Sequence, residues 1–146
     1  MTDRNQKLLG CASFNLRKAS RVVAQLYDQH LMPAGLKTTQ FTLLASLVHM
    51  GPASIGDLAA GLGMDRTTLT RNLRLLTQQG LIDIRSGQDA RTRSIVLTKK
   101  GRGALDRAIP LWQQAQNRFV ELFGGGRWQQ LHQELIEVTR GVRADK

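Results

Sequence analysis

The segment Asp65-Arg-Thr-Thr-Leu-Thr-Arg-Asn-Leu-Arg-Leu-Leu-Thr77 carries the strongest structural signal in this 146-residue sequence. Leu69, Leu73 and Leu76 recur at steps of four and three, a spacing that places them on one face of an α-helix. The opposite face carries arginines and threonines, namely Arg66, Thr67, Thr70, Arg71 and Arg74. The segment therefore predicts an amphipathic helix whose leucines face a core.

The ends and the chemistry of this helix can also be inferred. Asp65 can accept hydrogen bonds from first-turn N–H groups and Gly80 is typical of a helix end, so the helix should run to about Gln79. Arginine pairs bidentately with guanine, and threonine offers a hydroxyl to phosphate and a methyl to thymine. The outward face is thus suited to the major groove of DNA. The alternative is a solvated basic face, which the absence of i,i+4 Glu–Lys pairs disfavours.

The neighbouring segments complete a recognisable unit. Ser54 can cap a short helix that reaches Leu62, and Gly61-Leu-Gly63 predicts a turn before Asp65. After Gly80 the apolar period changes from 3.6 to 2, because residues 82–85 and 93–98 alternate on either side of a polar connector. Helix, turn, helix and hairpin over residues 54–97 is the order of a winged helix-turn-helix.

The tip of the hairpin is basic. Arg91 and Arg93 project from a short polar loop, and arginines on such a wing suit the minor groove, where negative potential concentrates. Asp89 can pair with one of them and order its side chain before binding. A solvent-exposed turn held in shape by the same pair is the alternative interpretation.

The flanking segments are expected to be helical. Apolar residues at steps of three and four predict helices over residues 8–31, from a cap at Thr98 to Phe123 with a kink at Pro110, and over residues 128–142. A further helix should begin at Thr38 or Thr39 and end before Gly51-Pro52. Its inward residues are expected to be Phe41, Leu44, Leu47 and Val48.

The outer helices carry more apolar surface than one small domain can cover. Large side chains would be exposed in a monomer at Trp112, Phe119, Phe123 and Trp128. Pairing with a second copy would bury them and place two reading helices about 34 Å apart, which selects a near-palindromic site. The alternative is a larger monomeric core. We expect a mainly α fold with a small β-hairpin wing, in which residues 37–103 bind DNA and residues 1–36 and 104–146 dimerise.

A family resemblance covers residues from about 8 to 142. The run Asp89-Ala-Arg-Thr-Arg-Ser-Ile-Val-Leu-Thr-Lys-Lys-Gly101 resembles the D-x-R…L-T-x-x-G signature of the MarR family of bacterial transcription regulators, and residues 65–73 resemble the start of its recognition helix. The resemblance implies a dimeric repressor or activator that a small ligand tunes from a cleft between two layers. It also implies that Arg91 is the minor-groove arginine of the wing and that the major-groove positions are Arg66, Thr67, Thr68, Thr70 and Arg71.

The amino-acid composition narrows the range of possible binding partners. Lys and Arg total 21 against 11 acidic residues, a net charge of +10, which favours a polyanion such as double-stranded DNA. A single cysteine fits a reducing cytosol, and the sequence shows neither a signal peptide nor a membrane span, so we expect a cytoplasmic protein with no membrane partner. The histidines lack ligand spacing and no nucleophile elbow is visible, so we expect no metal, no cofactor and no enzymatic activity.

The functional hypothesis is a sequence-specific, homodimeric transcriptional regulator, a repressor, with a small-molecule effector. Three alternatives stay open. Cys11, near the start of the first helix, is a candidate peroxide or redox sensor, although a free cysteine is most often a small buried hydrophobe. The second alternative is an architectural protein that coats DNA without sequence preference, and the third is an enzyme or adaptor that uses its winged helix for protein contacts.

Overall fold

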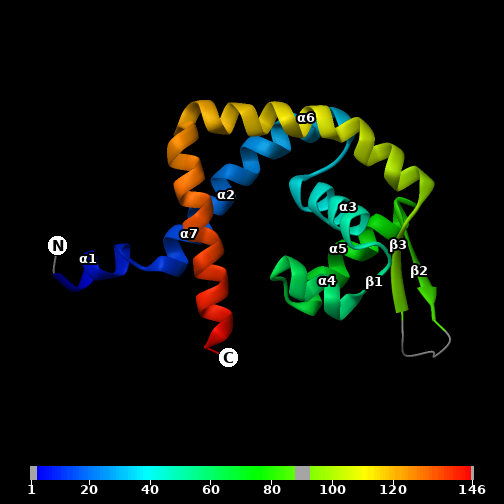
Figure 1. Ribbon diagram of the computed structural model, residues 1–146, viewed down its shortest axis with the longest axis horizontal. Coiled ribbons are helices and arrows are strands. Elements are labelled where there is room, and N and C mark those ends of the chain that lie inside the picture. The colour runs from blue at the N-terminus through cyan, green and yellow to red at the C-terminus, as the bar shows by residue number, and fades with distance from the viewer. Residues whose placement is uncertain (1–2, 88–92, 146) are drawn as a thin grey trace. The chain divides into compact units, whose positions relative to one another are not determined.

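The computed structural model describes residues 3–87 and 93–145, with side chains from residue 6 onward, and Figure 1 shows its course. Contacts divide the chain into two compact units, residues 27–112 and residues 1–26 with 113–146. The first extends beyond the expected DNA-binding range of 37–103 at both ends, and the functional division itself stays a prediction. The elements are α1 (Asp3–Leu9), α2 (Ala12–Leu31), a 3-10 turn (Met32–Ala34), α3 (Thr38–Met50), β1 (Ala53–Ser54), α4 (Ile55–Leu62), α5 (Arg66–Gln78), β2 (Ile82–Ser86), β3 (Arg93–Leu97), α6 (Lys99–Phe123) and α7 (Gly125–Ala144).

The strands form one antiparallel sheet in the order β1-β3-β2. In the hairpin, Ile84 lies opposite Ile95 and Arg85 lies opposite Ser94. Because opposed side chains share a face, the isoleucines and the arginine lie on different faces, as the alternation predicts. The predicted fold class, mainly α with a β-hairpin wing, is confirmed. Strand β1 adds a third strand, and two residues are too short for any alternation to show in the sequence.

The core of the 27–112 unit lies between the helices and the sheet. Leu69, Leu73 and Leu76 of α5 are at most 2% exposed, which confirms the predicted inner face. Each buried leucine contributes about 1.5–3 kcal/mol relative to an exposed one. The prediction for α3 is wrong at one position, since Val48 is 42% exposed and Leu43 is fully buried instead. Helix α3 contacts both α5 and β3, and its buried stripe is centred on Leu43, Leu44 and Leu47.

The first predicted helix is interrupted. Instead of one helix over residues 8–31, α1 ends at Leu9 and α2 begins at Ala12. The Asn15 side-chain amide donates to the carbonyl oxygens of Leu9 (2.7 Å) and Cys11 (2.9 Å). A short amide side chain that bonds nearby carbonyls competes with the helical pattern, and Gly10 adds freedom at the break. Apolar spacing alone does not register such a competition.

Helix α3 begins at Thr38, as expected, but neither Thr38 nor Thr39 is its cap. The N-cap is Lys37, and its backbone N–H donates to Gln40 Oε1 at 3.0 Å. The N–H of Thr38 donates to Asp28 Oδ1 at 2.7 Å. A carboxylate ten residues upstream therefore caps this helix. Only the fold brings it there, so local sequence rules could not find it.

The remaining helices follow the sequence more closely. Ser54 caps α4 by accepting from Asp57 N at 3.0 Å, as predicted. Pro110 lies inside α6, which continues to Phe123, and the kink expected there stays a prediction. Within the described ranges, none of the helices is long and apolar enough to cross a membrane. The same residues contain no group of His, Cys, Asp or Glu side chains arranged to hold a metal ion.

Candidate nucleic-acid interface

The start of α5 is fixed by one carboxylate. Asp65 Oδ1 accepts from the backbone N–H of Thr68 at 2.8 Å, and Asp65 Oδ2 accepts from the Thr68 hydroxyl at 2.8 Å. These two bonds, the backbone one first, hold the pKa of Asp65 below its ordinary value of 3.8. The predicted cap is confirmed, and the helix begins at a defined residue with its carboxylate ionised near neutral pH.

The outer face of α5 is exposed. Arg66, Thr67, Thr70, Arg71 and Arg74 together line an open surface hollow of about 390 Å³. With Leu69, Leu73 and Leu76 buried behind it, the face cannot turn inward without exposing the core. The chemistry on offer is guanidinium donors and hydroxyls on a rigid helix, which suits base edges and phosphates. Thr68 is the exception among the predicted contacts, because its hydroxyl is held by Asp65 and it does not line the hollow.

The two helices of the helix-turn-helix approach closely at Gly56. A Cβ atom added at Gly56 would lie 3.0 Å from a terminal guanidinium nitrogen of Arg66. The turn between them contains Gly63 at a φ of 64°, a left-handed conformation that favours glycine. Arg66 therefore extends along the start of α4 at one edge of the hollow.

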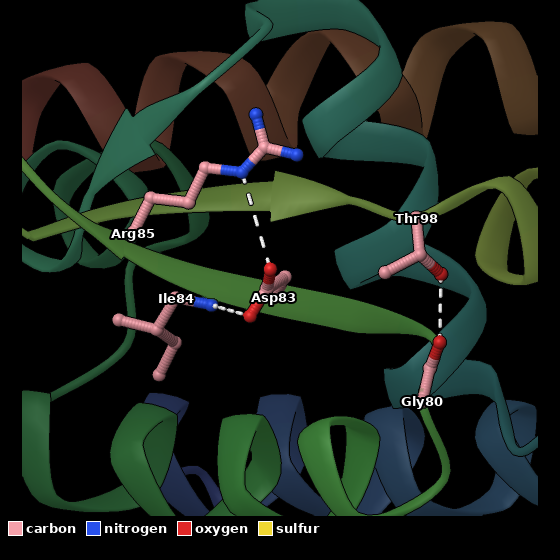
Figure 2. Close-up of polar contacts among 5 residues, drawn as sticks. All are labelled: Gly80, Asp83, Ile84, Arg85 and Thr98. Carbon is pink, nitrogen blue, oxygen red and sulfur yellow. Dashed lines mark hydrogen bonds and ion pairs between the residues drawn. The ribbon is translucent and has the colours of Figure 1, made fainter.

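The other end of α5 meets the end of the wing. Thr98 Oγ1 donates to the carbonyl of Gly80 at 2.7 Å, as Figure 2 shows, and accepts from Gly101 N at 2.9 Å, which confirms Thr98 as the cap of α6. A Cβ atom at Gly101 would lie 2.0 Å from the carbonyl oxygen of Leu81, so only glycine allows this approach. The threonine and glycine of the L-T-x-x-G signature thus join α5, β3 and α6.

The described part of the wing carries one predicted and one unpredicted arginine. Arg93 is exposed on β3, opposite Ser86, whereas Asp89 and Arg91 lie outside the described residues. Arg85 is also exposed, and its Nε lies 3.9 Å from Asp83 Oδ2 (Figure 2). The register places Arg85 and Arg93 on opposite faces of the hairpin. Sequence reasoning missed Arg85 as a wing arginine. The alternation of residues 82–85 places Arg85 on the outer face of the strand, so this pattern could have identified it.

A second, mostly apolar hollow of about 600 Å³ opens beside α3. Its walls include Phe41 and Trp112, whose rings stack with centroids 5.9 Å apart, and polar groups at Thr42, Ser46 and His49. Leu62 also lines it, and Leu62 is the last residue of α4, just before the turn into α5. A molecule held here would therefore contact the end of α4.

The aromatic residues expected to be exposed are partly covered. Trp112 belongs to the 27–112 unit and packs on Phe41. In the other unit, Phe119 stacks on Phe123 and meets Trp128 edge to face, with centroids 5.6 and 5.2 Å apart. The expectation that these side chains would be exposed in a single copy is therefore wrong, because all four are only partly exposed. Smaller apolar side chains take that role instead, including Leu122 at 61% and Val142 at 63% exposed.

Cys11 lies between α1 and α2 with its side chain exposed. The expectation that a free cysteine would be a small buried hydrophobe is wrong here. The backbone carbonyl of Cys11 accepts from Asn15 N at 3.0 Å and from the Asn15 side-chain amide at 2.9 Å. Its thiol is accessible to solvent, but accessibility alone does not make a thiol reactive.

Comparison with known proteins agrees with this geometry. The sequence model of the MarR family matches residues 34–92. An HTH-type transcriptional regulator of Bacillus subtilis (strain 168) is 29% identical over 85 residues, which is 58% of this chain but only 62% of that protein. The transcriptional regulator MosR of M. tuberculosis, solved in complex with DNA, is 38% identical with a TM-score of 0.84, over 93% of this chain and 98% of that one. The transcriptional repressor CouR, solved with a 23-mer DNA duplex, is 26% identical with a TM-score of 0.80, over 91% and 95% of the two chains. CouR has also been solved with p-coumaroyl-CoA.

Proposed function

Because this chain belongs to the MarR family of winged-helix, DNA-binding transcriptional regulators, which are not enzymes, we propose that it is a homodimeric repressor. It binds a near-palindromic operator in the cytoplasm, and a small-molecule effector tunes its affinity. Each copy places the outer face of α5 in a major groove and its wing in the adjacent minor groove.

The single observation that carries the base-reading role is the exposed hollow on α5. Five side chains able to contact bases and phosphates line it, while the leucines on the other side of the helix fix its orientation. On the wing, Arg93 and Arg85 are exposed cations, and the resemblance gives Arg91 the minor-groove contact. We assign Asp65 and Thr68 to holding the helix start, since their polar groups bond each other.

The homodimer is supported by the apolar surface of the unit formed by residues 1–26 and 113–146. Exposed apolar side chains there include Leu8, Leu9, Phe14, Leu16, Val22, Leu122, Val138 and Val142. Scattered exposed apolar residues need no explanation, but this number on a few helices is typical of an interface. A two-fold dimer would also present two reading helices to one DNA site.

Effector control is supported by the 600 Å³ hollow, whose size lies in the range of small-molecule sites and whose lining combines stacked rings with a few polar groups. An effector changes DNA affinity only if it binds the free and DNA-bound conformations with different affinity. The neighbour CouR, named a transcriptional repressor, has been solved both with a DNA duplex and with p-coumaroyl-CoA, which supports effector control.

Selection of bound sites from a pool of random 30-bp duplexes tests the proposal. We expect one recovered motif with two-fold symmetry and half-sites about 10 bp apart. The protein should prefer it to a scrambled duplex by about 10³–10⁷. Recovery of no common motif would instead favour an architectural protein. Sedimentation at micromolar concentration should show twice the chain mass of 16.2 kDa, and a 16.2 kDa species would contradict the dimer.

The exposure of Cys11 keeps the redox alternative testable. The selected duplex is titrated with wild-type protein and with Cys11→Ser, each before and after treatment with hydroperoxide. Loss of binding in the wild type alone would assign the regulation to Cys11. We expect equal binding in all four samples, because exposure is the only observation that favours a reactive thiol at Cys11. That result would leave the small-molecule effector as the proposed regulator.

A further inference from the structure

Three successive backbone carbonyls just after α5, those of residues 79–81, accept hydrogen bonds from one short segment. Lys100 Nζ donates to Gln79 O at 2.8 Å, Thr98 Oγ1 donates to Gly80 O at 2.7 Å, and Thr98 N donates to Leu81 O at 3.2 Å. We call this set of contacts the carbonyl clamp. It fixes the C-terminal end of the reading helix to the junction of β3 and α6.

The clamp acts where a helix end is weakest. The last carbonyls of a helix have no partner within it and carry partial negative charge, which a lysine donor complements. Gly80 takes the left-handed conformation at this end, with a φ of 72°. A Cβ there would lie 3.7 Å from Lys100 Cδ, so the lysine side chain runs directly beside the turn.

Lys100 is the one charged member of the clamp. Thr98 and Gly101 bring the backbone of α6 against Leu81, and that approach carries Lys100 to the carbonyl of Gln79. Its neighbour Lys99 is also exposed and has the same charge, but it makes none of the three contacts. Comparing substitutions of Lys99 and Lys100 therefore separates the effect of the side chain's position from the effect of its charge.

We infer that Lys100 is a positioning residue for sequence reading, acting through Gln79 to fix the angle of α5 and making no contact with DNA itself. The inference rests on the proposed function, in which the outer face of α5 reads bases. Bidentate arginine–guanine pairs are directional, whereas contacts to phosphate tolerate displacement and carry no sequence information. Loosening the clamp should therefore reduce specificity and leave general DNA affinity unchanged.

The test compares full-length wild type, Lys100→Met, Lys100→Arg and Lys99→Met. Methionine keeps helix propensity and most of the side-chain length but removes the donor, and Lys100 is exposed, so folding should be retained, as a melting curve checks. Each protein is titrated with two probes, the duplex recovered by selection and a scrambled duplex of the same composition. Both titrations are repeated across a salt series.

We expect Lys100→Met to weaken binding to the selected duplex about two- to five-fold, the size of one charge–helix-end interaction. Binding to the scrambled duplex and the salt slope should stay unchanged, Lys100→Arg should restore wild-type binding, and Lys99→Met should not lower the preference.

Three results would overturn the inference. Equal weakening on both duplexes, with a salt slope smaller by about 0.9, would make Lys100 a phosphate contact. If the wild type prefers the selected duplex and Lys100→Met shows the same affinities for both duplexes, the Lys100 side chain does not position α5. A wild type that binds both duplexes equally would refute the proposed function itself, and the inference with it.

Discussion

The two compact units of this chain differ in how they cover their apolar residues. In the 27–112 unit, leucines from α3, α4 and α5 form a core with exposures of a few per cent. Among the described residues of the other unit, Ala115 alone is fully buried, and side chains such as Leu122 and Val142 are mostly exposed. The 27–112 unit therefore has a core of its own. In the proposed dimer, a second copy would bury the exposed apolar side chains of the other unit.

The core of the 27–112 unit gives the largest expected effect. Leu73→Ala should lower the free energy of unfolding by about 2–5 kcal/mol, because Leu73 is 2% exposed and the cavity left behind cannot close fully. Leu75→Ala on the same helix is the matched control, since Leu75 is 48% exposed, and it should cost about 0.5 kcal/mol or less. Urea unfolding curves measure both, and equal losses would show that α5 is not packed as described.

Gly101 gives the next largest effect. Gly101→Ala places a Cβ 2.0 Å from the carbonyl oxygen of Leu81, and relieving this overlap should cost about 3 kcal/mol. Gly103→Ala, two residues further along α6, meets only the end of a flexible arginine at 3.4 Å and should be neutral or stabilising by up to about 1 kcal/mol. The melting temperatures of the two variants should therefore shift in opposite directions from that of the wild type, or by clearly different amounts.

The other unit should respond through association rather than folding. Leu122→Glu puts a charge on an apolar side chain that is 61% exposed in one copy, and it should weaken the dimer by about 1.5–3 kcal/mol per copy. Gln130→Glu adds the same charge at an exposed polar position of α7 and should leave the dimer intact. Sedimentation equilibrium distinguishes them, and a Leu122→Glu protein that stays dimeric would exclude this surface from the interface.

The smallest effect is the pH dependence of the α5 cap. The pKa of Asp65 is lowered in the folded state, so the stability it contributes is fully present above its ordinary value of 3.8 and is lost as the pH falls through the lowered pKa. Urea midpoints of wild type should therefore fall more steeply below about pH 4 than those of Asp65→Asn, which cannot titrate.

The Thr68 hydroxyl gives an independent check on this cap. Thr68→Val removes one of the two main hydrogen bonds to Asp65 and should raise the Asp65 pKa part of the way toward 3.8, because the backbone bond remains. NMR titration of the carboxylate measures the change. An unchanged pKa would show that the hydroxyl does not contribute.

Sequence reasoning worked where local rules decide the structure. The α5 helix, its cap at Asp65, its buried leucines and the two alternating strands of the hairpin all follow from spacing within about 20 residues. The exposed arginine and threonine face followed for the same reason, since burying one face of a helix leaves the other outside. The Thr98 cap of α6 also follows from local rules, whereas the physical role of Gly101 becomes visible only in the fold.

The errors lie where polar contacts or contacts between elements, which apolar spacing does not reveal, decide the structure. Asp28 caps α3 from another helix, and Asn15 interrupts the first predicted helix by bonding the carbonyls of Leu9 and Cys11. The place of Lys100 beside Gln79 depends on the approach of α6 to Leu81, which no sequence pattern encodes. Trp112 and Phe41 are far apart in sequence, so their stacking could not be foreseen either.

The central claim is that the outer face of α5 reads DNA, and the affinity of Arg71→Ala for the selected duplex tests it most directly. Arg118→Ala is the control, because Arg118 is also exposed, pairs with Glu121 at 3.3 Å and is not among the residues that line the α5 hollow. We predict that Arg71→Ala weakens specific binding by about 1–3 kcal/mol and relaxes the sequence preference at one position per half-site, with Arg118→Ala unchanged. Equal affinity and preference for wild type and Arg71→Ala would contradict the claim.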